Sequence, residues 1–155
     1  MRRILTITLV IVLGLCFAAT AYADSATKEE VIARVKEAVT LITNKGQDAA
    51  FKEISNKEGK FVWKDTYVFV FDFDGTLLAR PVYQEAIGKN WLNFKDKSNP
   101  PKQPTKDMVD LAKDKGEGWV EYMYPKPKEE APSKKISYIY RVPGKNLFVG
   151  AGIYE

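Results

Sequence analysis

Two aspartates follow a strongly apolar run in the middle of the chain. Asp72 and Asp74 stand in the sequence Asp-Phe-Asp-Gly-Thr, directly after residues 67–71, which are all aromatic or β-branched. An aspartate at the end of a buried strand can attack phosphorus in a phosphate ester, and a second aspartate can act as general acid/base beside a magnesium ion. Asp-Gly is also a favoured turn between two antiparallel strands. The motif therefore predicts either a magnesium-dependent phosphatase site or a hairpin turn.

The surroundings of this motif favour the hairpin turn. Locally the motif resembles the first motif of the haloacid dehalogenase-type phosphatases, with Asp72 as nucleophile and Asp74 as general acid/base. That family holds the motif in a doubly wound parallel sheet, whereas here two expected helices precede it and an antiparallel meander is expected after it. No acidic pair follows a later strand, because Asp107, Asp110 and Asp114 fall on an expected helix. Phosphatase activity is kept as the alternative hypothesis.

The composition excludes several kinds of site. The chain of 155 residues contains no His and a single Cys, Cys16, near its N-terminus. Disulfides, thiol nucleophiles, imidazole bases and the usual zinc sites are therefore not expected in residues 24–155, and neither is a cofactor. The 24 basic and 20 acidic residues are dispersed, with a net charge of +4. This distribution gives no indication of nucleic acid binding, and the length suits one domain.

The first 23 residues have the pattern of a secretory signal peptide. Residues 2–3 are arginines, residues 4–19 are mostly apolar, and Ala-Tyr-Ala at 21–23 fits the small-x-small cleavage rule. We expect cleavage after Ala23 and a periplasmic or secreted protein. Because the apolar run is only slightly shorter than the roughly 20 residues that cross a bilayer, an uncleaved N-terminal membrane anchor is the alternative.

The pattern after this segment predicts helices packed on an antiparallel sheet. Thr27 and Glu30 form a capping box, and apolar residues recur at three- and four-residue spacing up to Ile42. This pattern predicts a long amphipathic helix that ends at residues 44–46. Residues 67–72 read as a central strand covered on both faces. The other expected elements are a short helix at 47–54, a returning strand at 76–80, a solvated loop at 95–104, a helix at 105–115 with Gly116 as C-cap, and strands at 118–124, 135–142 and 147–154. This order predicts an α+β fold with an antiparallel sheet of about five strands.

Aromatic side chains alternate along two of the expected strands. The two-residue period places Tyr67, Phe69 and Phe71 on one face of their strand. It likewise places Tyr122 and Tyr124 together on one face of another strand. Tyrosines placed in this way can form an apolar wall that also offers hydroxyl groups to a ligand. For Phe71 and Trp119 we expect core packing.

Together these residues resemble the single Cache domains of the second type, which are PAS-like extracellular sensor modules. The resemblance covers nearly all of residues 24–155 in order and spacing. It rests on Asp65-x-Tyr67-Val-Phe-Val followed by Asp72-x-Asp74-Gly, Leu78-Ala-Arg80-Pro, Ile87-Gly-Lys-Asn90, Gly116-x-Gly118-Trp-Val-x-Tyr122, Lys135-x-Ser-Tyr138 and Val149-Gly-x-Gly-Ile-Tyr154.

The resemblance implies a long N-terminal helix packed on a five-stranded antiparallel sheet, with a pocket for a small organic acid or similar metabolite on the other face. Arg80 stands where this family usually has His, and its permanent charge would favour an anion such as a carboxylate. An exposed position at a strand end is the alternative for Arg80. Lys135 is a candidate second cation. The expected ligand-binding residues are Tyr67, Phe69, Arg80, Trp91, Tyr122, Tyr124, Lys135 and Tyr138, with core packing as the alternative for Tyr67, Phe69, Trp91 and Tyr138.

Relatives of this type usually sit between two membrane helices and feed a signalling domain. Since the sequence stops at Glu155, we expect a single Cache domain at 24–155 that acts as a free-standing exported binding protein without catalysis. It would present or scavenge a small ligand. Further expectations for its partners are docking as an accessory subunit on a membrane receptor, and a homodimer contact through the long helix.

Overall fold

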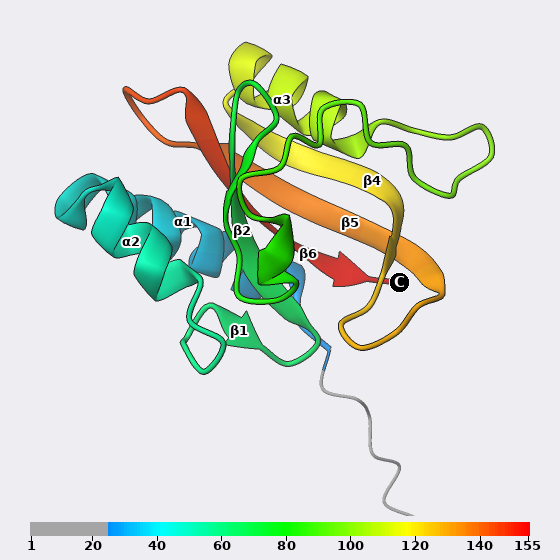
Figure 1. The fold of residues 1–155 in the computed structure, drawn as a ribbon, viewed down its shortest axis with the longest axis horizontal. Coiled ribbons are helices and arrows are strands. Elements are labelled where there is room, and N and C mark those ends of the chain that lie inside the picture. The colour runs from blue at the N-terminus through cyan, green and yellow to red at the C-terminus, as the bar shows by residue number, and fades with distance from the viewer. Residues whose placement is uncertain (1–24) are drawn as a thin grey trace, which may run out of the picture.

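One antiparallel sheet forms the centre of the molecule (Figure 1). The computed structural model describes residues 25–155, so the expected signal peptide lies outside the described part. The strands run in the order β1-β2-β6-β5-β4, and β3 pairs with the part of β2 that β1 leaves free. Their bounds are β1 Val62–Trp63, β2 Thr66–Asp72, β3 Leu77–Ala79, β4 Glu117–Pro125, β5 Pro132–Arg141 and β6 Leu147–Tyr154. The α+β prediction is confirmed, with six strands in place of about five because residues 62–63 add β1.

Two helices at the start of the described part pack beside each other on the sheet. α1 (Lys28–Lys45) begins with the predicted capping box, in which Glu30 N donates to the Thr27 hydroxyl at 3.2 Å and Thr27 N donates to the Glu30 carboxylate at 2.9 Å. α2 (Gln47–Ile54) follows after Gly46. The apolar stripe of α1 covers β2, β5 and β6. Within residues 25–155 no helix has both the length and the apolar character needed to cross a bilayer.

The two faces of the sheet have separate cores. Alternation along β2 turns Val68 and Val70 toward α1, and Tyr67 and Phe69 toward the opposite face. On that opposite face lies α3 (Pro104–Asp114), which packs against β4 and β5. β2 is therefore a central strand covered on both sides, as predicted.

The bounds of α3 differ slightly from the prediction. The helix begins one residue earlier, at Pro104, because proline is well accommodated in the first helical turn. Its C-cap is Lys115, and the expected cap residue Gly116 follows with a φ of 82°.

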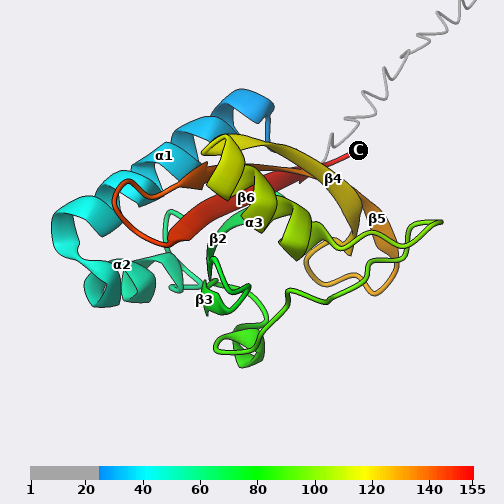
Figure 2. The same ribbon diagram turned by 90° about the horizontal axis from the view of Figure 1, so that it is seen from above.

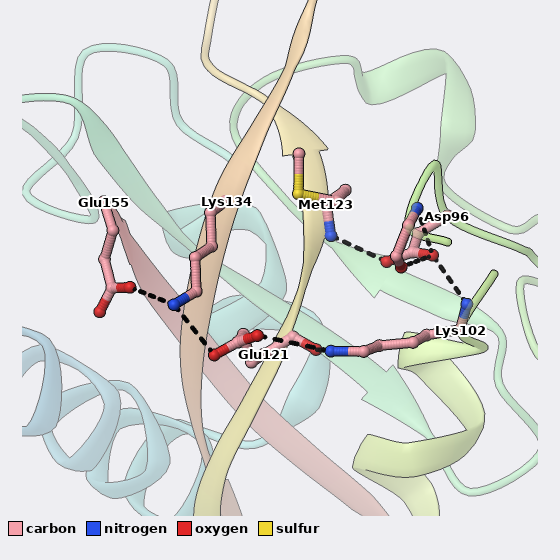
Figure 3. Close-up of polar contacts among 7 residues, drawn as sticks. Asp96, Lys102, Glu121, Met123, Lys134 and Glu155 are labelled. Atoms are coloured by element: carbon pink, nitrogen blue, oxygen red, sulfur yellow. Dashed lines mark hydrogen bonds and ion pairs between the residues drawn. The ribbon is translucent and has the colours of Figure 1, made fainter. Parts of the chain in front are cut away.

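Residues 80–103 cover the rest of the second face, with one 3-10 turn at Gln84–Ala86 and an isolated β-bridge from Asn90 to Thr76. Figure 2 shows the segment after β3 on the side of the sheet away from α1. The prediction of a solvated loop at 95–104 is wrong at Asp96, which is 4% exposed. Its carboxylate accepts hydrogen bonds from Lys102 N and from Met123 N on β4, each at 2.8 Å (Figure 3). These bonds fix the loop against the sheet.

Candidate ligand-binding site

A cavity lies between the sheet and the segments that cover its second face. Its volume is about 40 Å³, counted as the space open to the centre of a water molecule, whereas one bound water needs about 10–15 Å³. The cavity therefore suits a ligand of a few non-hydrogen atoms. It is lined from β2, β3, β4, β5, α3 and residues 80–94 by Tyr67, Phe69, Phe71, Leu77, Arg80, Trp91, Phe94, Pro104, Thr105, Met108, Tyr122, Tyr124 and Lys135.

Arg80 places a permanent positive charge in the cavity wall. It follows β3 directly and is 5% exposed, so the alternative of an exposed position at a strand end is wrong. Its Nη2 donates hydrogen bonds to the hydroxyl oxygens of Tyr67 at 3.0 Å and Tyr124 at 3.5 Å. Within residues 25–155 no carboxylate forms an ion pair with it. Because a guanidinium group stays charged in proteins, this buried charge is left without a counter-ion in the described part.

Lys135 adds a second buried cationic group from β5. The side chain is 1% exposed. Its Nζ lies 4.7 Å, 4.8 Å and 5.5 Å from the ring centres of Tyr67, Tyr154 and Tyr124. Among the described residues it has neither a carboxylate at ion-pair distance nor a hydrogen-bond acceptor. The ammonium group is therefore held by aromatic faces alone.

These surroundings change the proton affinity of the cavity groups. Burial, followed by repulsion from Arg80, lowers the pKa of Lys135 to about 7, and the carboxylate of Asp65 opposes this only in part. Burial also raises the pKa of Tyr67 and Tyr122, so both hydroxyls keep their protons at neutral pH. The cavity thus offers one permanent cation, one amine close to its titration point and several hydroxyl donors. None of its lining residues is acidic.

Two buried N–H groups at the cavity lack an acceptor. Arg80 Nε and Trp91 Nε1 have no hydrogen-bond partner within residues 25–155. Leaving a buried donor unpaired costs about 1–3 kcal/mol, and a ligand oxygen in the cavity would remove that cost. Arg80, Trp91 and Tyr124 also line an open groove on the outer surface. These three side chains therefore lie between the cavity and this groove.

The structure brings seven of the eight expected ligand-binding residues to this cavity. Tyr138 does not line it. Its ring lies 5.4 Å from that of Trp119 on the α1 face, and its hydroxyl donates to the Glu117 carboxylate. Since Tyr138 and Lys135 are three residues apart on one strand, they must point to opposite faces. The two-residue period of the strand was therefore enough to predict that Tyr138 and Lys135 could not both line the cavity.

Several lining residues were not among the expected ones. Phe71, expected only in the core, shares the face of Tyr67 and stacks on Phe148 at 5.9 Å while also lining the cavity. The strand period was the signal for it. Met108 and Thr105 come from α3, and no local pattern indicates that this helix closes a cavity. Phe94 and Leu77 were likewise missed.

The Asp72 motif forms the hairpin turn between β2 and β3. One Asp72 carboxylate oxygen accepts hydrogen bonds from Asp74 N at 3.0 Å and from Thr76 N at 2.7 Å. Gly75 has a φ of 83°, which favours glycine. Among residues 25–155 no group of three or more His, Cys, Asp or Glu could hold a metal ion. This geometry gives no support to the phosphatase alternative.

Comparison with known proteins identifies relatives by sequence. The family model described as Cache domain matches residues 42–155. The sensor histidine kinase MctS of Rhizobium johnstonii is 30% identical over 91 residues, which are 59% of this chain and 19% of the kinase. The chain thus spans about a fifth of the length of that relative.

Solved structures have the same fold. A Cache chemosensory domain, described as a structural basis for carboxylic acid recognition, superposes with a TM-score of 0.71 at 27% identity, over 81% of this chain and 91% of its own. A methyl-accepting chemotaxis protein from Vibrio parahaemolyticus gives a TM-score of 0.68 at 23% identity, over 82% of this chain and 87% of its own. At that identity the second likeness concerns the fold alone.

Proposed function

Since this chain belongs to the Cache domain family, we propose that residues 24–155 form a sensor-type domain that binds a small organic carboxylate without converting it. The observation behind this proposal is the pair of buried basic side chains, Arg80 and Lys135, around one cavity with no acidic lining residue. An anion would supply the missing counter-charge. The similar Cache chemosensory domain described for carboxylic acid recognition supports the same class of ligand.

The size and polarity of the cavity narrow the ligand further. A carboxylate fits the fork of N–H groups that a guanidinium offers, and the unpaired Arg80 Nε is one of them. Apolar rings such as Phe69 and Phe71 line the rest of the cavity, which suits a short hydrocarbon portion better than a second charged group. A volume of about 40 Å³ corresponds to an acid of roughly two to four carbon atoms.

A thermal-shift titration of the purified protein tests this proposal. Acetate, propionate, pyruvate and lactate, compared with equal concentrations of chloride, should stabilise the fold saturably. At 100 times the dissociation constant the gain in unfolding free energy is about 2.7 kcal/mol. Arg80→Ala should lower affinity roughly 10- to 150-fold, because it removes charge-assisted hydrogen bonds.

Arg141→Ala is the matched control, since Arg141 is on the same sheet, stacks on Phe73 and does not line the cavity. Equal ligand responses of both variants and the wild type would remove Arg80 from the site. The absence of any response to short carboxylates would contradict the proposed function.

We further propose that the first 23 residues are removed after Ala23 and that the domain acts outside the cytoplasm, where it presents its ligand to a membrane receptor or scavenges it. The pattern of residues 1–23 supports export. N-terminal sequencing of the protein recovered from cells tests the cleavage. A mature start at Asp24 is expected, and an intact Met1 would instead favour the membrane-anchored alternative.

A further inference from the structure

We propose that Lys135 binds short 2-oxo carboxylates covalently, as a reversible imine, while Arg80 holds the carboxylate group. This inference rests on the proposed function, because it requires a carboxylate in the cavity. It separates 2-oxo carboxylates from other short carboxylates, which charge pairing with Arg80 alone would not distinguish. The carbonyl carbon next to the carboxylate is the atom that Lys135 would capture.

The position of Lys135 is unusual for a lysine. Its side chain is 1% exposed and lines the same cavity as Arg80. The centre of the Tyr67 ring lies close to both basic groups, at 4.7 Å from Lys135 Nζ and 5.3 Å from Arg80 Cζ. No carboxylate or other acceptor within residues 25–155 engages Nζ. The amine is thus presented to the cavity instead of being tied to a protein partner.

The charges around Lys135 favour its neutral, nucleophilic form. Arg80 faces it as a cation, Asp65 is the one carboxylate with a resolved influence on it, and tyrosine rings fill the remaining space. Burial and the repulsion by Arg80 lower its pKa to about 7. At neutral pH the Lys135 amine is therefore unprotonated in a large fraction of the protein molecules. A desolvated lysine beside another cation is the arrangement that activates lysines for attack on carbonyl groups.

The neighbouring residue Lys134 differs from Lys135 in both exposure and charge pairing. It is exposed, and its Nζ forms ion pairs with Glu121 at 3.2 Å and with Glu155 at 2.7 Å (Figure 3). Hydrogen bonds to these carboxylates raise its pKa. Lys134 therefore stays protonated and points away from the cavity, although it precedes Lys135 directly on β5. It provides a matched control for the reactivity of Lys135.

The chemistry needs no reagent beyond the ligand and water. The Lys135 nitrogen lone pair forms a C–N bond to the keto carbon, and the C=O π electrons move to oxygen. One nitrogen proton passes to that oxygen, the hydroxyl then leaves as water with the second nitrogen proton, and the C=N bond closes. The sum is amine plus ketone to imine plus water, and hydrolysis reverses it. The Tyr67 hydroxyl stays protonated because burial raises its pKa, so it can donate a hydrogen bond to that oxygen without giving up its proton.

Reductive trapping tests the inference on the purified protein. Pyruvate or glyoxylate with cyanoborohydride should give one irreversible lysine adduct per chain, mapped to Lys135 by peptide mass spectrometry of the wild type. Labelling of Lys135 should exceed that of Lys134 by at least roughly tenfold, because only the former has much neutral amine at pH 7. Lactate has no carbonyl group and should give no adduct, although it should stabilise the fold. Lys135→Arg should abolish trapping, whereas Lys134→Arg should not.

The outcomes separate the two proposals. Stabilisation by pyruvate without any adduct at Lys135 would overturn the imine and leave carboxylate binding in place. Labelling spread evenly over surface lysines would also overturn it. If neither stabilisation nor an adduct were found, both proposals would fail. Mapping on the wild type keeps the test decisive even where a Lys135 variant folds poorly.

Discussion

Arg80 donates a hydrogen bond of 3.0 Å to the hydroxyl oxygen of Tyr67. The two residues come from neighbouring antiparallel elements, since Tyr67 belongs to β2 and Arg80 directly follows β3. The guanidinium group also lies 5.3 Å from the centre of the same ring. The cation is therefore oriented by the sheet itself, and a ligand would meet a preorganised fork.

Tyr67→Phe should weaken carboxylate binding while the domain stays folded. The change removes the oxygen that orients Arg80 and leaves the ring in place. Loss of one hydrogen bond of this kind is worth about 0.5–1.5 kcal/mol, so affinity should fall roughly 2- to 10-fold in a calorimetric titration. Tyr138→Phe is the control, because Tyr138 lies on the α1 face, and its affinity should equal that of the wild type. A loss in both variants would contradict the assignment of the cavity.

The affinity for simple carboxylates should decrease as pH rises through 7. The pKa of Lys135 is lowered to about 7 in the free protein, and a bound anion favours the ammonium form. Binding above pH 7 must therefore take up a proton, and affinity can fall by up to about tenfold per pH unit until Arg80 alone holds the ligand. Titrations of propionate between pH 6 and 9 in buffers of different ionisation enthalpy would measure this uptake. Lys135→Met should make the affinity independent of pH over this range.

Lys135 should also make the unfolding free energy depend on pH. Its folded pKa of about 7 is below the ordinary value of 10.5. Between these values the unfolded chain binds a proton that the folded state does not, so stability rises with pH and the gain is complete only above 10.5. Between pH 7.5 and 9.5 the unfolding free energy of the wild type, measured by urea denaturation, should rise by about 1.4 kcal/mol per pH unit relative to that of Lys135→Met. Parallel curves for the two proteins would show that Lys135 titrates normally.

Asp72→Ala should destabilise the fold without affecting the ligand. The carboxylate accepts two backbone hydrogen bonds in the hairpin turn, so its loss should cost about 1–3 kcal/mol of unfolding free energy. The Asp74 side chain is exposed, and Asp74→Ala should cost far less. Propionate binding should be unchanged in both variants. Magnesium-dependent hydrolysis of a phosphate ester that disappeared in both would instead restore the phosphatase hypothesis.

Gly150→Ala should reduce both stability and carboxylate affinity. A Cβ at Gly150 would lie 2.5 Å from two ring atoms of Phe69, a residue of the cavity wall. The ring must shift, which costs about 1–3 kcal/mol through overpacking, and the shift changes the cavity wall because Phe69 is part of it. Denaturation and calorimetry on the same preparation would measure the two effects. A stable variant with full affinity would show that Phe69 can move without entering the ligand space.

Much of this architecture could be predicted because the signals are local. The capping box of Thr27 and Glu30 fixes the start of α1, and alternation along β2 separates the two cores. The Asp-Gly turn likewise encodes the hairpin in adjacent residues. The resemblance to Cache domains also came from motifs within single strands and turns. In each case the decisive interaction joins residues that are close in sequence, or depends only on the strand period.

The tertiary structure decided what those local signals could not. It places Arg80 and Lys135, 55 positions apart in the numbering, in one cavity beside Tyr67, and adds Met108 of α3 to the lining of that cavity. It also buries Asp96 in a loop that reads as solvated, because its partner Met123 N lies on a distant strand. The physical reason is that burial and charge are properties of a cavity, which exists only after strands and segments remote in sequence have packed together. The lowered pKa of Lys135 therefore belongs to the fold and has no trace in the sequence around it.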